Sequence, residues 1–265
     1  MTAYDKLKAA RANGRPTALS YIENILTDYM FFHGDRRFGE DAAIEGGIGY
    51  LGKIPVTFLS IEKGTDLPGR MRRNFGCPKP EGYRKALRLM KQAEKFGRPV
   101  ICFVDTLGAY CGAEAEERGQ GQAIAENILE MSALQVPILT TVIGEGGSGG
   151  ALGLGMADRV YMLRNAVYSV ISPEGCASII WKDSSKVADA AECLHITAED
   201  MVEFGVAEHI FEEDFINFDK MCTVMRSRYL KDLSELRAKA PHLLLDERYN
   251  RYRRIGVYSE SRENI

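Results

Sequence analysis

The run Gly144-Glu145-Gly146-Gly147-Ser148-Gly149-Gly150 follows an apolar segment, 137–143, and precedes a helix of small residues that is predicted to begin near Ala151. A backbone with so few side chains lets a ligand approach the main chain closely. The first amides of a helix have no internal acceptor, and they lie at the positive end of the helix dipole. The run therefore predicts a site where main-chain N–H groups bind an oxyanion or a phosphate.

The same order of strand, glycine loop and helix occurs earlier in the chain. The apolar run 99–105 leads into the loop 106–112, and a helix is predicted from there to about Leu134. Two further strands are predicted at 159–163 and 167–172. Alternating strands and helices indicate parallel β-α units, whose ligands bind at the carboxyl ends of the strands. Both glycine loops are predicted at such ends.

The segments around these units are predicted to form helices and one hairpin. Residues 1–35 look helical, with Thr17 as N-cap of an apolar stretch, 19–32. A hairpin is predicted over 44–61, and an amphipathic helix with one apolar and one cationic face over 81–96. The cationic face and the loop before it carry Arg70, Arg72, Arg73, Arg84, Lys85 and Arg88.

After Pro173 the chain is predicted to be mostly helical. The sequence contains no linker and no low-complexity tract, so one domain over 1–265 is predicted. Within it, the N-terminal helical segment 1–35 and a C-terminal helical segment, 215–265, are expected to pack on the domain or on partner subunits. Arginines near the end of the chain are expected to dock on a partner: Arg248, Arg251, Arg253 and Arg254.

Composition indicates a globular protein with no obligatory nucleic-acid or membrane partner. The 265 residues have a formal net charge of −3. The first residues lack the apolar core of a signal peptide and no apolar run approaches a membrane span, so a cytoplasmic location is expected. Six cysteines without a C-x-x-C pair are expected to be reduced thiols, and four isolated histidines indicate no metal site in this chain.

Several chemistries fit the glycine run by itself. The G-x-S-x-G pattern matches a serine hydrolase elbow, with Ser148 as nucleophile and His195 or His209 as base. The G-x-G-x-x-G pattern matches a dinucleotide site, with Glu174 as a distant ribose ligand, although that pattern normally opens the first β-α unit. A purely structural turn is also open. In the remaining alternative the amides bind an oxyanion and Ser148 is incidental.

Over about 17–254 the chain resembles the α subunit of bacterial acetyl-coenzyme A carboxylase carboxyltransferase. It resembles the short form, without the N-terminal helical extension that many members carry. The segments that carry the resemblance are Arg72-Arg-Asn-Phe-Gly76, Pro80 to Met90, Asp105-Thr106 with Gly108-Ala109-Tyr110, Ala115 to Gln120, Val142 to Leu152 and Ser172 to Ser178.

The resemblance implies an α/β fold of the crotonase or ClpP type, a spiral of β-β-α units with helical N- and C-terminal additions. It implies a zinc-ribbon β subunit as partner in an α2β2 assembly, with the active site between the two. The carboxyl group of carboxybiotin, held on a biotin carboxyl carrier protein and supplied by an ATP-dependent biotin carboxylase, would pass to acetyl-CoA. The product, malonyl-CoA, is the committed precursor of fatty acids.

The resemblance also implies roles for particular residues. The N–H groups of Gly149 and Gly150 would form the oxyanion hole for the ureido oxygen of biotin. The pocket around them would be formed by Gly146, Gly147, Ser148, Gly108, Ala109 and Tyr110. Arg72 and Arg73, with the rest of the cationic stretch named above, would contact coenzyme A phosphates or an acidic carrier, and the alternative for that stretch is a solvated helix face. No metal is expected in this chain, since the family's zinc belongs to the β subunit.

Three residues depart from the family's pattern at the first glycine loop. Leu107 and Cys111 replace prolines, and Glu114 replaces a glycine. Proline fixes the backbone angle φ, so a looser turn is expected. A carboxylate near the pocket is expected to affect substrate entry. A further alternative is therefore a subunit that binds coenzyme A or its partner without catalysing transfer.

Overall fold

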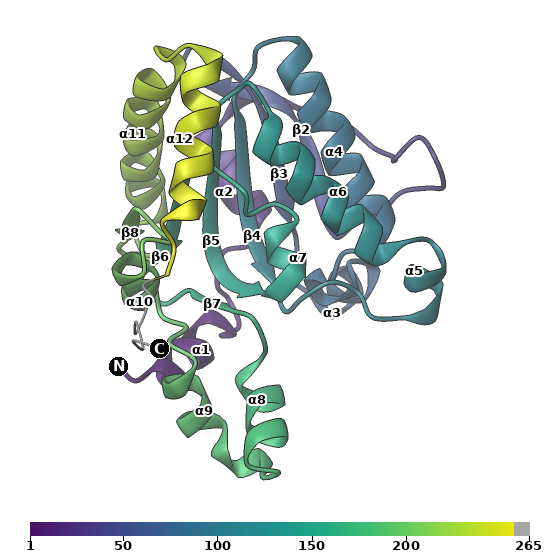
Figure 1. Ribbon diagram of the computed structural model, residues 1–265, viewed down its shortest axis with the longest axis vertical. Helices are drawn as coiled ribbons and strands as arrows, with labels where there is room; N and C mark the ends of the chain where they lie inside the picture. The colour runs from purple at the N-terminus through teal and green to yellow at the C-terminus, as the bar shows by residue number, and fades with distance from the viewer. Residues whose placement is uncertain (257–265) are drawn as a thin grey trace, which may run out of the picture.

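The computed structural model describes residues 1–256 and has one mixed sheet at its centre (Figure 1). The strand order is β1-β2-β3-β4-β5-β6-β8, and β7 pairs with the end of β5. The first three strands are antiparallel and the others are parallel. The strands are β1 Thr27–Phe31, β2 Ile44–Leu51, β3 Ile54–Ile61, β4 Val100–Thr106, β5 Ile138–Gly147, β6 Arg159–Leu163, β7 Val167–Ser169 and β8 His209–Phe211.

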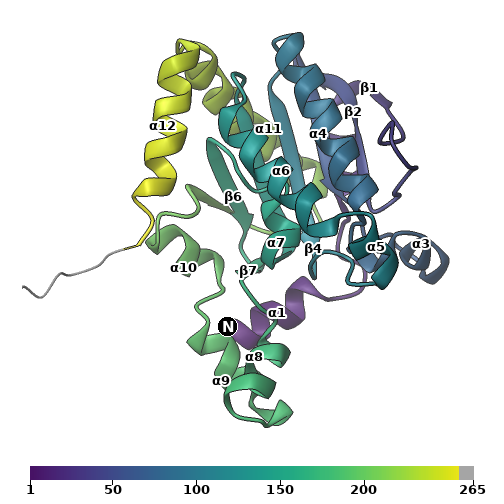
Figure 2. The same cartoon turned by 45° about the vertical axis from the view of Figure 1, so that its right-hand side comes forward.

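Helices cover both faces of the sheet, with α4 and α6 packed together on one face and α2 against α11 on the other (Figures 1 and 2). Helices α8 and α9 project below the sheet, where α1 packs on α9. The helices are α1 Ala3–Ala10, α2 Ala18–Ile25, α3 Leu67–Arg72, α4 Pro80–Lys95, α5 Ala113–Glu117, α6 Gln120–Ala133, α7 Ser148–Leu152, α8 Pro173–Ile180, α9 Val187–Cys193, α10 Ala198–Glu203, α11 Phe218–Arg237 and α12 Pro241–Arg253, with short 3-10 turns at Asn74–Gly76 and Ser184–Lys186.

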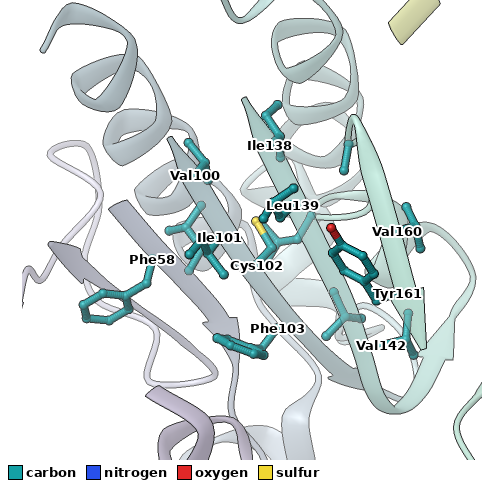
Figure 3. Close-up of a cluster of buried hydrophobic side chains, with 14 of the residues drawn as sticks. Phe58, Val100, Ile101, Cys102, Phe103, Ile138, Leu139, Val142, Val160 and Tyr161 are labelled. Carbon is teal, nitrogen blue, oxygen red and sulfur yellow. The ribbon is translucent and has the colours of Figure 1, made fainter. Parts of the chain in front are cut away.

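The central strands are buried on both faces, as their continuous apolar sequences predict. Every residue of β4 is buried, and so are the first nine of β5. Figure 3 shows their side chains packed with those of β3 and β6. The two threonines within β5 are satisfied inside this core, because Thr140 donates to the Leu154 carbonyl and Thr141 shares a hydrogen bond with Tyr229. The core thus fixes β5 and the position where its glycine end emerges.

Strand β5 changes partner along its length. Residues 139–142 pair with β6, whereas 145–147 pair with β7. At the change, a Cβ on Gly144 would lie 2.3 Å from the Asp105 carboxylate, so glycine is required there. The glycine run is therefore not the loop that the sequence predicted: β5 continues through Gly147 and α7 begins directly at Ser148.

The N-terminal prediction was partly wrong. Helix α2 starts after Thr17 as expected, but it ends at Ile25, and Thr27–Phe31 forms an edge strand against β2. A positive φ of 48° at Asp28 interrupts any helix there. The hairpin offers an unpaired edge, and the aromatic residues of this segment suit a strand. The predicted helix after the first glycine loop is also divided in two, at Gly119, whose φ is 80°.

The predicted cationic face of α4 is not free. Lys85 is fully buried, where it forms an ion pair with Glu40 and donates to the Asp41 carbonyl at 3.0 Å. Arg84 binds Asp35 at 2.8 Å, and Arg88 donates to the Gly34 carbonyl at 3.0 Å. These cations hold the 33–41 loop against α4.

Asp35, in that loop, is expected to make the stability of the folded chain depend on pH. Asp35 is 4% exposed, and its Oδ1 accepts hydrogen bonds from three successive N–H groups, those of Arg37, Phe38 and Gly39. Burial alone would raise the pKa of Asp35, but these donors and Arg84 outweigh it and lower the pKa to about 2. Because the folded-state pKa lies below the unfolded value, the stabilisation is complete above about pH 5 and is lost as the pH falls toward 2.

We therefore expect Asp35→Asn to reduce the free energy of unfolding by about 2 kcal/mol at pH 7. The difference from the parent should shrink as the pH falls below 4, because the parent's carboxylate becomes protonated. Urea unfolding at pH 7, 5 and 3.5 measures it. An equal difference at every pH would show that the Asp35 charge does not contribute.

The C-terminal segment forms two helices, α11 and α12, and residues 257–265 of the predicted segment 215–265 lie outside the described part of the chain. Two of the arginines expected to dock on a partner are engaged within the chain: Arg248 binds Asp158, and Arg251 binds Glu208 at 2.7 Å. The expectation was wrong for both. That 1–265 forms one domain remains a prediction.

Candidate functional site

The two glycine segments meet backbone to backbone. A Cβ on Gly147 would lie 2.1 Å from the carbonyl oxygen of Leu107, and a Cβ on Gly150 would lie 2.5 Å from the nitrogen of Ala109. Gly108 has a φ of 149°, which disfavours any other residue. No side chain fits between the segments, so glycine is needed at these positions for the turn after β4 to contact the start of α7.

The start of α7 presents main-chain N–H groups. The residue before the helix, Gly147, provides no capping side chain, and the amides of Ser148, Gly149 and Gly150 belong to the first turn, which has no intrahelical acceptor. The space beside Gly149 is open, because the nearest atom to a Cβ there would be 3.9 Å away, on Ile124. The Gly149 amide lies beside this space and can donate to an oxygen of a ligand, whereas Gly150 is buried against the turn after β4.

The turn after β4 is locked by its own side chain. Thr106 Oγ1 accepts from the Gly108 N–H at 3.0 Å and donates to the Gly108 carbonyl at 2.8 Å. The Gly108 N–H is thus occupied within the turn. Gly108 and Ala109 thus lie against Gly150, and their role in shaping a binding pocket remains a prediction.

A cavity of about 570 Å³ borders the glycine segments and contains charged side chains. Gly146, Gly147 and Leu107 form part of its wall. Beside them, Asp105 Oδ1 accepts from the Glu145 N–H at 2.8 Å and lies 2.6 Å from Lys63 Nζ. Asp105 and Glu145 are each 6% exposed. The end of β5 is therefore held by a buried carboxylate that a lysine neutralises.

Arg11 connects this cluster to two other elements. Its guanidinium binds Glu145 Oε2 at 2.9 Å and Glu174, at the start of α8, at 2.5 Å. Burial opposes the charge on Glu174, but Arg11 outweighs it and holds the pKa of Glu174 below its usual range. The Glu174 carboxylate is already committed to Arg11, which argues against the ribose-binding role of the dinucleotide alternative.

A second cavity, of about 390 Å³ and mostly apolar, borders α7. Ser148, Gly149 and His195 are among its lining residues. Across residues 1–256, however, Ser148 forms no hydrogen bond with a histidine, and His195 Nδ1 lies 3.5 Å from Asp200. His209 stacks edge-on against Phe211. The arrangement needed for a serine hydrolase is not assembled.

The structure brings some predicted site residues together and separates others. The segment from Gly146 to Gly150 contacts the turn that contains Gly108 and Ala109. The Tyr110 ring instead packs against Lys79, whose Nζ lies 4.7 Å from the ring centroid. Arg73 is 8% exposed and binds Glu45 at 3.2 Å, so its charge is neutralised within the chain.

The remaining predicted residues lie on exposed parts of the same region. Arg72 is exposed at the end of α3. Glu114, one of the three departures from the family's pattern, lies 3.5 Å from Lys79, while Leu107 is 50% exposed. The added carboxylate is therefore paired beside the first loop.

Sequence reasoning missed the charged residues of the larger cavity. Lys63 follows the end of β3, and Asp105 is the last residue but one of β4. Ligands bind at the carboxyl ends of parallel strands, so these positions could have indicated a binding site. Glu145 lay within the glycine run itself. Arg70 was named as part of a cationic stretch, but neither it nor Arg11 carried a signal for this cavity, because only the fold brings α1 and α3 to the end of β5.

The described residues hold no group of three or more histidine, cysteine or acidic side chains placed to bind a metal ion. Within the same residues, no helix combines the length and apolar character that crossing a membrane requires.

A family model described as acetyl co-enzyme A carboxylase carboxyltransferase-like matches residues 1–256. The acetyl-coenzyme A carboxylase carboxyl transferase subunit alpha of Ruminiclostridium cellulolyticum is 54% identical over 98% of this chain and 100% of its own length. A beta/alpha protein of Clostridium tetani is 52% identical over 97% of this chain, which spans 46% of that longer relative.

Solved structures show the same fold at low sequence identity. Transcarboxylase 12S superimposes with a TM-score of 0.71 at 18% identity, covering 87% of this chain and 43% of the other. The beta subunit of geranyl-CoA carboxylase from P. aeruginosa gives a TM-score of 0.65 at 15% identity, covering 98% of this chain and 47% of the other. The predicted crotonase-like α/β fold is confirmed.

Proposed function

This chain belongs to the acetyl co-enzyme A carboxylase carboxyltransferase-like family, and we propose from that membership and from the glycine site that it works as the α subunit of the carboxyltransferase. It transfers a carboxyl group to acetyl-CoA, which gives malonyl-CoA for fatty acid synthesis. The enzyme class is that of a biotin-dependent carboxyl transferase.

The chain functions with a carboxyltransferase β subunit. Relatives such as the Clostridium tetani protein carry beta and alpha subunits in one chain, which supports a close association of the two. We further propose an α2β2 assembly whose β subunit holds the zinc. Biotin on its carrier protein and the biotin carboxylase that charges it complete the proposed set of partners.

The single observation that carries the site assignment is the pair of amides at the start of α7. Biotin, when bound, supplies the ureido nitrogen that carries the carboxyl group. What supports a site for its ureido oxygen is that Gly149 and Gly150 lie in the first turn of α7, whose amides have no intrahelical acceptor, with open space beside Gly149. Donors positioned in advance stabilise developing negative charge, and each typically contributes about 3 kcal/mol to lowering the barrier.

The test uses both chains. We would coexpress this chain with a zinc-ribbon β subunit and follow the reverse reaction, in which malonyl-CoA and biocytin yield acetyl-CoA. Acetyl-CoA that forms only when both chains and biocytin are present supports the proposal. A stable complex without turnover would favour the non-catalytic alternative and direct attention to Leu107, Cys111 and Glu114.

The serine hydrolase alternative makes an opposite prediction for Ser148. We expect Ser148→Ala to leave carboxyl transfer close to the parent rate, since the proposed donors are main-chain N–H groups that alanine retains. The positive φ of 43° at this position strains serine and alanine alike. Steady-state kinetics of the reverse reaction measure the effect, and a loss of nearly all turnover would return Ser148 to the catalytic residues.

A further inference from the structure

Within the part of the chain that the structure describes, one cation of the charged cavity has no acidic partner. Four cationic and three acidic side chains line this cavity: Arg11, Arg15, Lys63 and Arg70, with Asp105, Glu145 and Glu174. Arg11, Arg15 and Lys63 each form ion pairs, Arg15 with Glu213 at 2.5 Å. Among residues 1–256, no carboxylate lies within ion-pairing distance of Arg70. With Glu213, the partner of Arg15, four carboxylates face these four cations, so the attraction for an anion comes from Arg70, whose charge is not paired by any described carboxylate.

Arg70 is positioned by the chain but only weakly bonded. It lies on α3, whose start is fixed by Asp66 accepting the Gly69 N–H at 2.8 Å. Its Nε lies 3.3 Å from the Gly64 carbonyl, and its two terminal nitrogens are both 3.3 Å from the neutral Asn13 side-chain oxygen. These are long bonds to uncharged acceptors. A half-buried guanidinium binds a carboxylate with two parallel, charge-assisted bonds, which are considerably stronger.

Lys63 supplies a second cation on the same segment. It directly precedes Gly64, whose carbonyl binds Arg70, and its side chain is 20% exposed. Its Nζ lies 2.6 Å from Asp105 and 3.6 Å from Glu145. Gly76 makes room for the lysine stem, since a Cβ there would lie 2.6 Å from Lys63 Cγ. The ammonium is therefore held in place at the cavity wall.

The position of these cations relates them to the transfer site. This cavity is bordered by Leu107, Gly146 and Gly147, the last of which directly precedes α7. Gly149 lines the adjoining cavity, and Ser169 lines both. We infer that Arg70, with Lys63 beside it, binds the carboxylate of the group that is transferred; this inference rests on the proposed function. The amides would then bind the ureido oxygen while the two cations bind the carboxylate attached to the ring.

A pair of stable biotin derivatives tests this inference by binding. One is a biotin amide with a carboxymethyl group on the ureido nitrogen, and the other is its methyl ester, which differs by one negative charge. Titration calorimetry on the complex with the β subunit gives both dissociation constants. We expect the parent to bind the acid about tenfold more tightly than the ester. Arg70→Met should abolish that preference and leave the affinity for the ester unchanged.

Arg72→Met is the matched control, because Arg72 belongs to the same helix, is exposed and does not line the cavity. It should keep the parent's preference for the acid. The inference is overturned if the parent shows no preference, if the acid does not bind, or if Arg70→Met retains the preference. Failure of the proposed function would appear separately, as absence of reverse transfer by the parent complex.

A double variant separates binding by Lys63 from charge neutralisation. Lys63→Met alone leaves Asp105 without its cation. Combining Lys63→Met with Asp105→Asn removes both charges, and the amide oxygen of the new side chain can still accept the Glu145 N–H. If Lys63 only neutralises Asp105, the double variant should recover the preference for the acid. We expect it to recover thermal stability while the preference stays reduced.

Discussion

Gly150→Val should abolish carboxyl transfer. A Cβ at this position would lie 2.5 Å from the Ala109 nitrogen and 2.6 Å from the Gly108 carbonyl carbon, so the main chain of one segment must move. Movement displaces the N–H groups from the ureido oxygen. Loss of a single oxyanion donor lowers kcat by about 10²–10³, and we expect at least that loss. Reverse transfer from malonyl-CoA to biocytin, measured with the β subunit present, gives the value.

Gly149→Ala is the matched control for this substitution. Its Cβ would meet only Ile124, at 3.9 Å, and alanine keeps the N–H group. Turnover is expected to fall much less than in Gly150→Val, because the methyl group enters the open space beside the amide without displacing the main chain. Replacing glycine within a helix favours folding by about 0.4–1 kcal/mol. Copurification with the β subunit and the unfolding temperature of each variant separate lost assembly from lost chemistry. If Gly150→Val assembles and turns over normally, the amides of this segment are not the oxyanion donors.

The sequence predicted the centre of the fold because its local signals and its packing agree. The apolar runs that became β4 and β5 have the length and continuity of buried parallel strands. The helix at Pro80–Lys95 has a clear period and a glycine after its end. The predicted hairpin is also present, as β2 and β3, and its strands extend to the pair Leu51 and Ile54. Such elements depend little on distant residues.

The errors arise where distant residues decide the structure. Thr27–Phe31 is a strand only because β2 offers it an edge. Lys85 looked solvent-exposed by its helical period, but the 33–41 loop covers it and supplies Glu40 as its partner. The glycine run looked like a loop because glycine weakens strands, yet pairing with β7 extends β5 through Gly147. None of these contacts is visible in the local sequence.

The candidate site likewise has one part that the local sequence predicts and one part that depends on the fold. The main-chain donors could be predicted because glycine content and a helix start are local features. The charged cavity could not, since Arg11, Lys63, Asp105 and Glu145 come from four separate segments. Their pairing follows from the strand order, which places the ends of β3, β4 and β5 side by side.

The largest expected loss of stability comes from Arg248, on α12. Its side chain is 1% exposed and forms two bonds of 2.8 Å to the Asp158 carboxylate. It also donates to carbonyls of Met131, Leu134 and Val136, at and beyond the end of α6. Unpaired carbonyls at a helix end are stabilised by such a cation. Asp158 in turn accepts the Ile138 N–H at 2.7 Å, which ties the cluster to the start of β5.

Arg248→Met should therefore lower the free energy of unfolding by about 3–5 kcal/mol, because it leaves a buried carboxylate and several carbonyls unpaired. For a chain of this size each kcal/mol corresponds to about 2–4 °C in Tm, so a decrease of about 6–20 °C is expected in thermal unfolding. Arg253→Met, an exposed change on the same helix, should stay within about 0.5 kcal/mol of the parent. Equal unfolding temperatures for the two variants would mean that Arg248 does not hold α12 to the sheet. Adding Asp158→Asn to Arg248→Met should restore part of the loss, since it removes the buried charge that the first substitution leaves without a partner.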